Sequence, residues 1–295
     1  MVAGYSIAFP HLGIEIGHLS KAFSIFNFSI SYYALIITAG IIAGAFLAIR
    51  EAERTGQNVD NYYDFAILVV FTSIIGARIY YVIFEWDSYK DNLLSVFNLR
   101  AGGLAIYGAV IAAVVTLILF ARKKKMSVGL MMDTGVLGLV LGQIIGRWGN
   151  FVNREAFGGY TDGLFAMQLK LTEVYNNNYI TPEIAEHIVT VDGTQYIQVH
   201  PTFLYESMWN IMVLVVLLLY RRHKRFDGEV FCFYLIGYGI GRAWIEGLRT
   251  DQLRIGNIAV SQALSVVLAV AALAYVVFRR KKQKKEEWKE LLEEK

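Results

Sequence analysis

Seven stretches of mainly apolar residues, each close to the length that a helix needs to cross a lipid bilayer, constrain this chain more than any other feature. They cover about residues 26–49, 62–84, 101–121, 130–148, 203–220, 229–247 and 258–278. A spanning helix needs roughly 20 such residues. Hydrophobic residues make up 56% of the chain and charged residues only 18%. This is more apolar sequence than a water-soluble globular protein needs for its core. We therefore expect an all-α polytopic membrane protein with seven transmembrane helices, which form a single integral membrane domain over residues 1–295.

The remaining segments are more polar. Residues 1–25 are too mixed to span a membrane and are expected at its surface or interface. Between the fourth and fifth stretches, about residues 155–202 form a polar insert in which Val189–Val199 alternates as strands do. We expect a small extramembrane arm here. The charged tail, residues 279–295, is expected to continue the seventh span as a solvated helix.

Lysines and arginines are distributed unequally between the two sides of the expected membrane. One side carries 18 of them, in Arg50 and Arg54, in the loops 122–125 and 221–225, and in the tail, whereas the other side carries seven. Positive residues are retained in the cytoplasm. We therefore expect the amino terminus outside, the carboxyl terminus in the cytoplasm, and the arm on the extracytoplasmic side.

Three arginines fall within or near the ends of the apolar stretches, where an arginine costs several kcal/mol or more unless it faces a polar cavity or partner. In the expected orientation Arg78, Arg147 and Arg242 all lie in the outer half of the membrane. Tyr33 and Tyr107 fall at the same level. Their shared depth suggests a common site, although each tyrosine could instead belong to an aromatic belt, and Arg78 could be structural or interfacial.

The sixth apolar stretch carries an unusual row of polar residues. Tyr238, Arg242, Glu246 and Arg249 recur at intervals of 4, 4 and 3 residues, which places them on one helical face. A structural ion pair between Arg242 and Glu246 is the simpler explanation. The acids that we place in the spans at this level, Glu206 and Glu246, are nevertheless fewer than the three arginines, which favours an anionic ligand.

The sequence from Gly146 to Gly159, GRWGNFVNREAFGG, concentrates polar groups at the end of the fourth apolar stretch. Within eight residues of Arg147 come Asn150, Asn153, Arg154 and Glu155. If the helix continues through Asn150, this residue shares a face with Arg147. Arginine and amide groups together suit a phosphate or carboxylate. A helix end capped by asparagine, with an arginine reaching toward water, explains these residues equally well.

Residues typical of metal or thiol chemistry are few. Cys232 is the one cysteine and lies in an apolar run, which excludes an internal disulfide and a cysteine-based cluster. The five histidines lack the spacing of metal ligands. We therefore expect no metal, no other cofactor and no nucleic-acid partner.

The stretch GRWGNFVNREAFGG resembles the signature of the prolipoprotein diacylglyceryl transferase family, glycine-arginine-x-glycine-asparagine-phenylalanine-x-asparagine-x-glutamate ending in glycine. The resemblance covers nearly the whole chain, because other motifs follow in matching order: SYYALI, GARIYYV, RAGGLAIYGA, HPTFLYE, YGIGRAWIEGLRTD and SQALS. The long signature is highly specific, and the shorter motifs support it by their order and spacing.

The resemblance implies the first step of bacterial lipoprotein maturation, in the cytoplasmic membrane with the active site toward the outer leaflet. Members of the family move the diacylglyceryl group of phosphatidylglycerol onto the thiol of a lipobox cysteine in a prolipoprotein and release glycerol phosphate. The residues expected in catalysis are Arg147, Arg242, Glu246, Tyr107 and Tyr33. Those expected to bind substrate are Arg147, Asn150, Asn153, Glu155, Gly158, Tyr238, Arg242, Arg78 and Arg249.

One position departs from the family pattern. Many members have a histidine, favoured as the base, where this chain has Tyr107. A neutral tyrosine is a poor general base near pH 7 because its pKa is about 10. We therefore expect Tyr107 to orient the donor or the thiol, with Glu246 or solvent as the proton acceptor. A belt tyrosine remains the alternative.

Two other classes of protein could use some of these features. An anion or lipid transporter could use the same arginines, but it would favour internal repeats and broken helices near the midplane, and the chain shows no internal repeat. A structural membrane scaffold leaves the shared depth of the arginines unexplained. A transferase accounts for both the shared depth of the arginines and the lack of an internal repeat.

Overall fold

The computed structural model describes residues 4–26, 28–99, 102–256 and 258–293, the last six by their backbone. The chain is mostly helical. Within the described residues, six helices are long and apolar enough to cross a membrane. They are α1 (Tyr32–Arg54), α2 (Val59–Phe84), α3 (Ile106–Lys123), α4 (Val128–Asn153), α6 (Thr202–Tyr220) and α8 (Val260–Glu293). The expectation of a polytopic membrane protein is therefore confirmed.

The remaining long helix, α7 (Glu229–Leu248), covers the sixth expected span but is not one of these six. Its 20 residues include Arg242 and Glu246 near the end, and these charges lower its hydropathy. Eight of its residues are buried, and they lie on more than one side of the helix, so α7 packs largely inside the protein.

Residue contacts divide the chain into two compact units. Unit 1 comprises residues 1–44 and 136–295, and unit 2 comprises residues 45–135. The boundary passes through α1 and α4. Unit 1 therefore holds α6, α7, α8, the arm and the signature stretch, whereas unit 2 holds α2 and α3.

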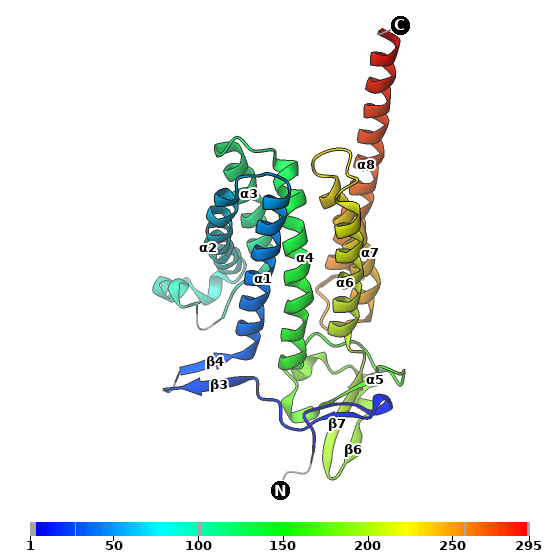
Figure 1. Ribbon diagram of the computed structural model, residues 1–295. Helices are drawn as coiled ribbons and strands as arrows, with labels where there is room; N and C mark the ends of the chain where they lie inside the picture. The colour runs from blue at the N-terminus through cyan, green and yellow to red at the C-terminus, as the bar shows by residue number, and fades with distance from the viewer. Residues whose placement is uncertain (1–3, 27, 100–101, 257, 294–295) are drawn as a thin grey trace. The chain divides into compact units, whose positions relative to one another are not determined.

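The helices of unit 1 pack closely where small residues meet. A Cβ added at Gly44 in α1 would lie 2.5 Å from the carbonyl oxygen of Gly138 in α4, and one at Gly138 would collide with Gly44 in turn. Close backbone approach between helices through glycine is typical of membrane proteins. Figure 1 shows α4, α6 and α7 side by side, and one hydrogen bond of 2.9 Å, from Nε2 of Gln143 to the hydroxyl of Tyr234, joins α4 to α7.

The arm of unit 1 and the amino-terminal residues together form an antiparallel sheet of five strands in the order β2-β1-β5-β7-β6. The strands are β1 (Ile7–Phe9), β2 (Ile14–Ile16), β5 (Met167–Lys170), β6 (Val189–Val191) and β7 (Thr194–Val199). The expected alternation over 189–199 is confirmed as β6 and β7. The amino-terminal residues, expected only at a surface, supply two strands: Ile7 pairs with Leu169, and its side chain is fully buried.

Smaller elements complete unit 1. The hairpin β3 (Ala22–Ile25) and β4 (Phe28–Ser31) leads directly into α1, so the first helix begins later than the expected residue 26. The short helix α5 (Pro182–Glu186) lies in the arm, and the hairpin β8 (Arg254–Ile255) and β9 (Ile258–Ala259) precedes α8. Helix α8 continues through the expected tail to Glu293 and extends past the ends of α6 and α7 (Figure 1).

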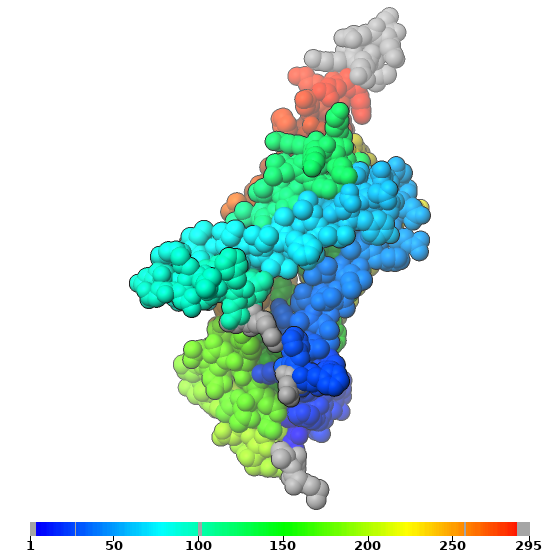
Figure 2. Space-filling view, turned by 90° about the vertical axis from the view of Figure 1, so that its left-hand side faces the viewer, coloured from blue at the N-terminus to red at the C-terminus, as the bar shows by residue number. Residues whose placement is uncertain are grey.

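Unit 2 has its own core. Ala52, Tyr62, Phe120, Ala121 and Met131 pack together at one end of the helices. After α2 the chain forms short 3-10 helices over Trp86–Ser88 and Leu93–Phe97, a segment that stands out from the end of α2 in Figure 2. Its large apolar side chains are exposed, including Leu94 and Phe97. Arg100 and Ala101, which open the third-span motif, lie outside the described residues.

Candidate active site

The centre of the site is a carboxylate held between two arginines, and these three side chains come from three different helices. Oε2 of Glu206 in α6 lies 2.9 Å from Nε of Arg147 in α4. Its other oxygen, Oε1, accepts a hydrogen bond of 2.7 Å from Nη1 of Arg242 in α7. Only 4% of the Glu206 side chain is exposed, whereas 20% of Arg147 is. The carboxylate is therefore enclosed, and both guanidinium groups are fixed against it.

Arg242 also bonds along its own helix. Its Nη2 lies 2.6 Å from Oε2 of Glu246, one turn further on. The simpler explanation of this pair, an i,i+4 ion pair, is thus seen in the structure, but Arg242 pairs with Glu206 at the same time. Glu206 contacts Nη1 and Glu246 contacts Nη2 of the Arg242 guanidinium, and these two contacts together fix the orientation of its plane.

Arg249, which caps α7, makes a bidentate ion pair with Asp251. Nε and Nη2 of Arg249 lie 2.8 and 2.7 Å from the two carboxylate oxygens of Asp251. Arg147, Arg242 and Arg249 are therefore matched by Glu206, Glu246 and Asp251. The surplus expected from the sequence counted Arg78, Arg147 and Arg242 against Glu206 and Glu246. With Arg249 in place of Arg78 and with Asp251 included, this group has equal numbers of arginines and acids, so a surplus of positive charge does not explain it.

Whether the cluster can bind a phosphate depends instead on which guanidinium N–H groups have no partner in the protein. Arg147 uses Nε for Glu206, and its two terminal nitrogens have no protein partner in the described part of the chain. These nitrogens belong to the arginine with the most exposed side chain of the three. Arg147 can therefore offer two parallel N–H donors to an anion while Glu206 holds it.

The signature stretch forms the end of α4 and the turn after it. Helix α4 continues to Asn153, so Arg147 and Asn150 do share a helical face. Nδ2 of Asn150 donates a 2.8 Å hydrogen bond to Oε1 of Glu155, and Asn153 also bonds to this carboxylate. Burial raises the pKa of Glu155, and these two amides partly offset the effect. The three side chains thus form one connected group.

Arg154 has a structural role in this turn. It adopts a positive φ of 54°, which is uncommon for a residue other than glycine. Its side chain, 1% exposed, pairs with Glu173 at 3.0 Å and donates to the carbonyl oxygens of Val152 and Leu19. Arg154 therefore ties the turn to the arm.

Backbone hydrogen bonds join the turn to the residues just before α6 and to the last residue of α7. The N–H of Gly158 donates to the carbonyl oxygen of His200 (3.0 Å), and the N–H of Gly159 donates to that of Leu248 (2.9 Å). A Cβ at Gly158 would lie 2.7 Å from the Cβ of His200, so only glycine fits there. The ends of the three helices that carry Arg147, Glu206 and Arg242 are thus linked through main-chain atoms.

Two tyrosines expected in the site also lie in unit 1. The ring of Tyr33, at the start of α1, covers Gly149, where a Cβ would come within 2.8 Å of its Cδ2. The ring of Tyr238 stacks on that of Tyr234, with centroids 5.4 Å apart. Tyr33 therefore lies against the signature helix at Gly149, which stands between Arg147 and Asn150 in the sequence.

The other two expected site residues, Arg78 and Tyr107, belong to unit 2. The guanidinium of Arg78 donates to five main-chain carbonyl oxygens, those of Ser95, Val96, Asn98, Gly102 and Gly103. A Cβ at Gly103 would lie 2.4 Å from Nη1 of Arg78. Arg78 thus holds the segment between α2 and α3 in shape. Tyr107 is half-buried near Tyr80, with ring centroids 6.4 Å apart.

Sequence reasoning missed the roles of Glu206 and Asp251. Glu206 was recognised only as an acid at the right depth, and Asp251 was not considered. The available signals were an acid inside an otherwise apolar run, in the motif HPTFLYE, and an acid two residues after Arg249 in GLRTD. No group of three or more metal-ligating side chains occurs among the described residues.

The chain is similar to known proteins over most of its length. Residues 20–278 match the family described as prolipoprotein diacylglyceryl transferase. The chain is 43% identical over 262 residues to the phosphatidylglycerol–prolipoprotein diacylglyceryl transferase of Listeria monocytogenes, covering 88% of this chain and 90% of that protein. It is 41% identical over 255 residues to the protein of the same name from Bacillus mycoides, covering 86% and 89%. This chain therefore belongs to the prolipoprotein diacylglyceryl transferase family.

Proposed function

We propose that this protein transfers the diacylglyceryl group of phosphatidylglycerol to the thiol of a lipobox cysteine in a prolipoprotein. The reaction forms a thioether and releases glycerol phosphate. The observation that carries the proposal is the pair of arginines, Arg147 and Arg242, held on either side of one buried carboxylate, Glu206. The family to which the chain belongs supports the choice of substrates.

In the reaction, the cysteine sulfur attacks the glycerol carbon that bears the phosphate. The new C–S bond forms as the C–O bond to the phosphate breaks, and the leaving group departs as a phosphate monoester. Its charge increases during this step, so donors that are already oriented stabilise the transition state more than the ground state. The open terminal N–H groups of Arg147 supply such donors, with Arg242 fixed beside them by Glu206.

The attacking thiolate comes from the substrate, so the enzyme needs no cysteine of its own. A free thiol has a pKa of about 8.5, and neighbouring arginines lower it. Glu246 or solvent accepts the proton, and Tyr107 orients the donor or the thiol by its hydroxyl. Tyr33 contributes to catalysis from its position against α4 at Gly149.

The remaining site residues bind and orient the donor. Asn150, Asn153 and Glu155 form the connected polar group after Arg147, and Gly158 allows the turn to approach α6. Tyr238 and Arg249 extend the same surface along α7. Arg78 acts indirectly, because its guanidinium shapes the segment after α2.

We further propose seven spans, with α7 as the sixth, the amino terminus outside and the carboxyl terminus in the cytoplasm. The charges of Arg242 and Glu246 are paired with each other and with Glu206, which offsets their cost inside a bilayer. In this orientation the arginine cluster lies at the level of the outer leaflet of the bacterial cytoplasmic membrane, where the phosphate of the donor lipid is accessible.

The test is a transfer assay with the purified protein in detergent, phosphatidylglycerol and a lipobox peptide, read by the mass of the thioether product. Arg147→Lys and Arg242→Lys keep the charge but lose the planar fork of donors, and each should reduce turnover at least 100-fold. Arg222→Lys, at an exposed loop position, is the matched control and should retain turnover. Lipid movement without thioether product would favour a transporter, and near-normal turnover of both site variants would reject the assignment of the arginines.

A further inference from the structure

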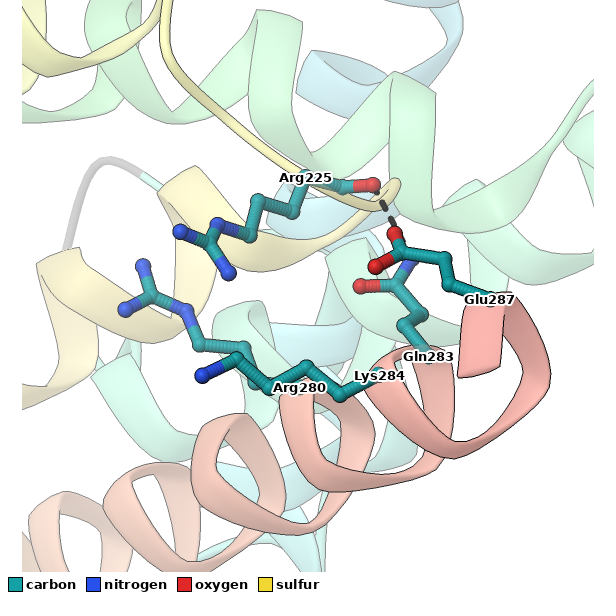
Figure 3. Close-up of a pocket in the computed structure, with 5 residues that line it drawn as sticks. All are labelled: Arg225, Arg280, Gln283, Lys284 and Glu287. Carbon is teal, nitrogen blue, oxygen red and sulfur yellow. Dashed lines mark hydrogen bonds between the residues drawn. The ribbon is translucent and has the colours of Figure 1, made fainter. Parts of the chain in front are cut away.

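A second basic site lies at the other end of the helices of unit 1. A pocket of about 450 Å³ opens between the α6–α7 loop and the second half of α8. Its lining residues are Arg225, Arg280, Gln283, Lys284 and Glu287. In Figure 3 the cationic ends of Arg225, Arg280 and Lys284 gather on one side of this pocket, and Glu287 lies on the opposite side.

Arg280 is held in position rather than free in solvent. Its Nε donates to Oε1 of Glu229 at 2.7 Å, and its Nη2 donates to the hydroxyl of Tyr220 at 2.6 Å. Glu229 is completely buried, and its second oxygen accepts the main-chain N–H of Arg225 at 2.6 Å. An arginine that only marked the cytoplasmic side of a membrane would need no such support. The remaining terminal nitrogen, Nη1, has no partner within the described residues.

The same contacts fix the wall of the pocket. Nε2 of Gln283 donates to the carbonyl oxygen of Arg225 at 3.1 Å, which ties α8 to the loop. The guanidinium of Arg225 is exposed and has no ion-pair partner in the described part of the chain. Counting the lining residues together with Glu229, three cations meet two carboxylates, which leaves one positive charge. A single phosphodiester would balance this set.

The position of the pocket selects a lipid as the source of the phosphate. Arg279 and Arg280 directly follow the apolar part of α8 and lie over the rings of Phe226 and Phe233, 5.2 and 5.7 Å from the ring centroids. Amphipathic arginine and aromatic side chains meet in this way at the level of lipid headgroups. Tyr220 is 14 residues beyond Glu206 along α6, roughly 21 Å at 1.5 Å per residue. The pocket is therefore separate from the arginine cluster.

We propose that this pocket binds the phosphate of an anionic phospholipid in the leaflet that faces the charged tail. Arg225, Lys284 and the open nitrogen of Arg280 contact the phosphate, and Glu287 limits the charge that the site accepts. The site would tie the loop and α8 to the membrane surface. It takes no part in the transfer reaction.

The test measures the binding of phosphatidylserine, which carries a phosphodiester but lacks the glycerol headgroup of the donor, by native mass spectrometry of the purified full chain. The double variant Arg225→Gln with Lys284→Gln should bind it at least tenfold more weakly. The control, Lys281→Gln with Lys285→Gln, removes the same charge from exposed positions of α8 that do not line the pocket, and should change binding less than twofold. Glu287→Gln should tighten binding. All variants should unfold at the same temperature in neutral detergent.

Three results would overturn the proposal. Equal weakening in the two double variants would show attraction to surface charge alone. Weakening in Arg147→Lys to the same degree would place the lipid at the transfer site. Equal stabilisation by inorganic phosphate at the same concentration would identify a free anion, and not a lipid, as the ligand. Phosphatidylcholine, which has no net charge, should bind equally weakly to the wild type and to the first double variant.

Discussion

Glu206→Gln is the substitution that most directly tests how the arginines are held. Glutamine matches glutamate in size but carries no charge, so Arg147 loses its ion pair while Arg242 retains Glu246. Hydrogen bonds to a charged group contribute about 1.5–3 kcal/mol each. Breaking a buried ion pair by removing one partner costs about 3–5 kcal/mol, because it leaves a buried charge uncompensated. Glutamine still offers one acceptor oxygen. We therefore expect the free energy of unfolding to fall by an amount near the lower limit of the range for a broken buried ion pair.

The effect on catalysis should exceed the effect on folding. If Arg147 no longer presents its terminal N–H groups in the right plane, the transition state loses one oriented donor, which costs about 10²–10³ in kcat. We therefore expect turnover of the lipobox peptide to fall about 100-fold, with the KM for phosphatidylglycerol changed much less. Glu206→Asp, which keeps the charge with a shorter side chain, should fall between this variant and the wild type.

Glu51→Gln is the matched control for this experiment. Glu51 is also a buried glutamate, 5% exposed, and pairs with Arg54 at 2.6 Å. The same substitution there should lower the unfolding temperature in detergent without reducing turnover of the folded protein. If Glu206→Gln kept wild-type kcat after correction for the folded fraction, the carboxylate would have no role in positioning the arginines, and the reasoning above would be refuted.

Three further predictions concern other parts of the chain. Tyr107→Phe should lose part of the rate and Tyr107→His should retain activity; a completely inactive Phe variant, with a wild-type rate that rises with a tyrosine-like pKa, would identify Tyr107 as the base. Gly138→Ala should lower the unfolding temperature markedly, because its Cβ would lie 2.1 Å from the carbonyl oxygen of Gly44, whereas Gly135→Ala meets no atom within 4 Å and should be neutral or slightly stabilising. Reporter fusions after Lys124 and near Asn177 should read cytoplasmic and external, respectively, and an external signal at Lys124 would contradict the proposed orientation.

The helices could be predicted from the sequence because each depends on a local property, the length of an apolar run. The ends of α2, α6 and α7 lie within a few residues of the expected limits. The strand β1 could not be found in this way. Its three residues gain their partners only when Leu169 and its neighbours, far along the chain, pair with them.

The site shows the same division between local and distant information. The spacing of Arg242 and Glu246 on one helix was sufficient to expect their contact, and the run from Arg147 to Asn150 was expected on one face. Glu206 was undervalued because its importance depends on α4 and α7 both placing an arginine beside it. Likewise Arg78 was expected to bind substrate from its depth alone, whereas its five carbonyl partners depend on the path of the segment after α2.

The main-chain links of Gly158 to His200 and Gly159 to Leu248 have a consequence for how this protein responds to its membrane. Helices in a bilayer that is too thick or too thin adjust by tilting, at a cost of a fraction of a kcal/mol per ångström of mismatch. Because α4, α6 and α7 are joined at the end that carries the arginines, such tilting should pivot about that end and displace mainly the opposite one. The distance between Arg147 and Arg242 should therefore stay nearly constant when the acyl chains of the surrounding lipids are lengthened or shortened.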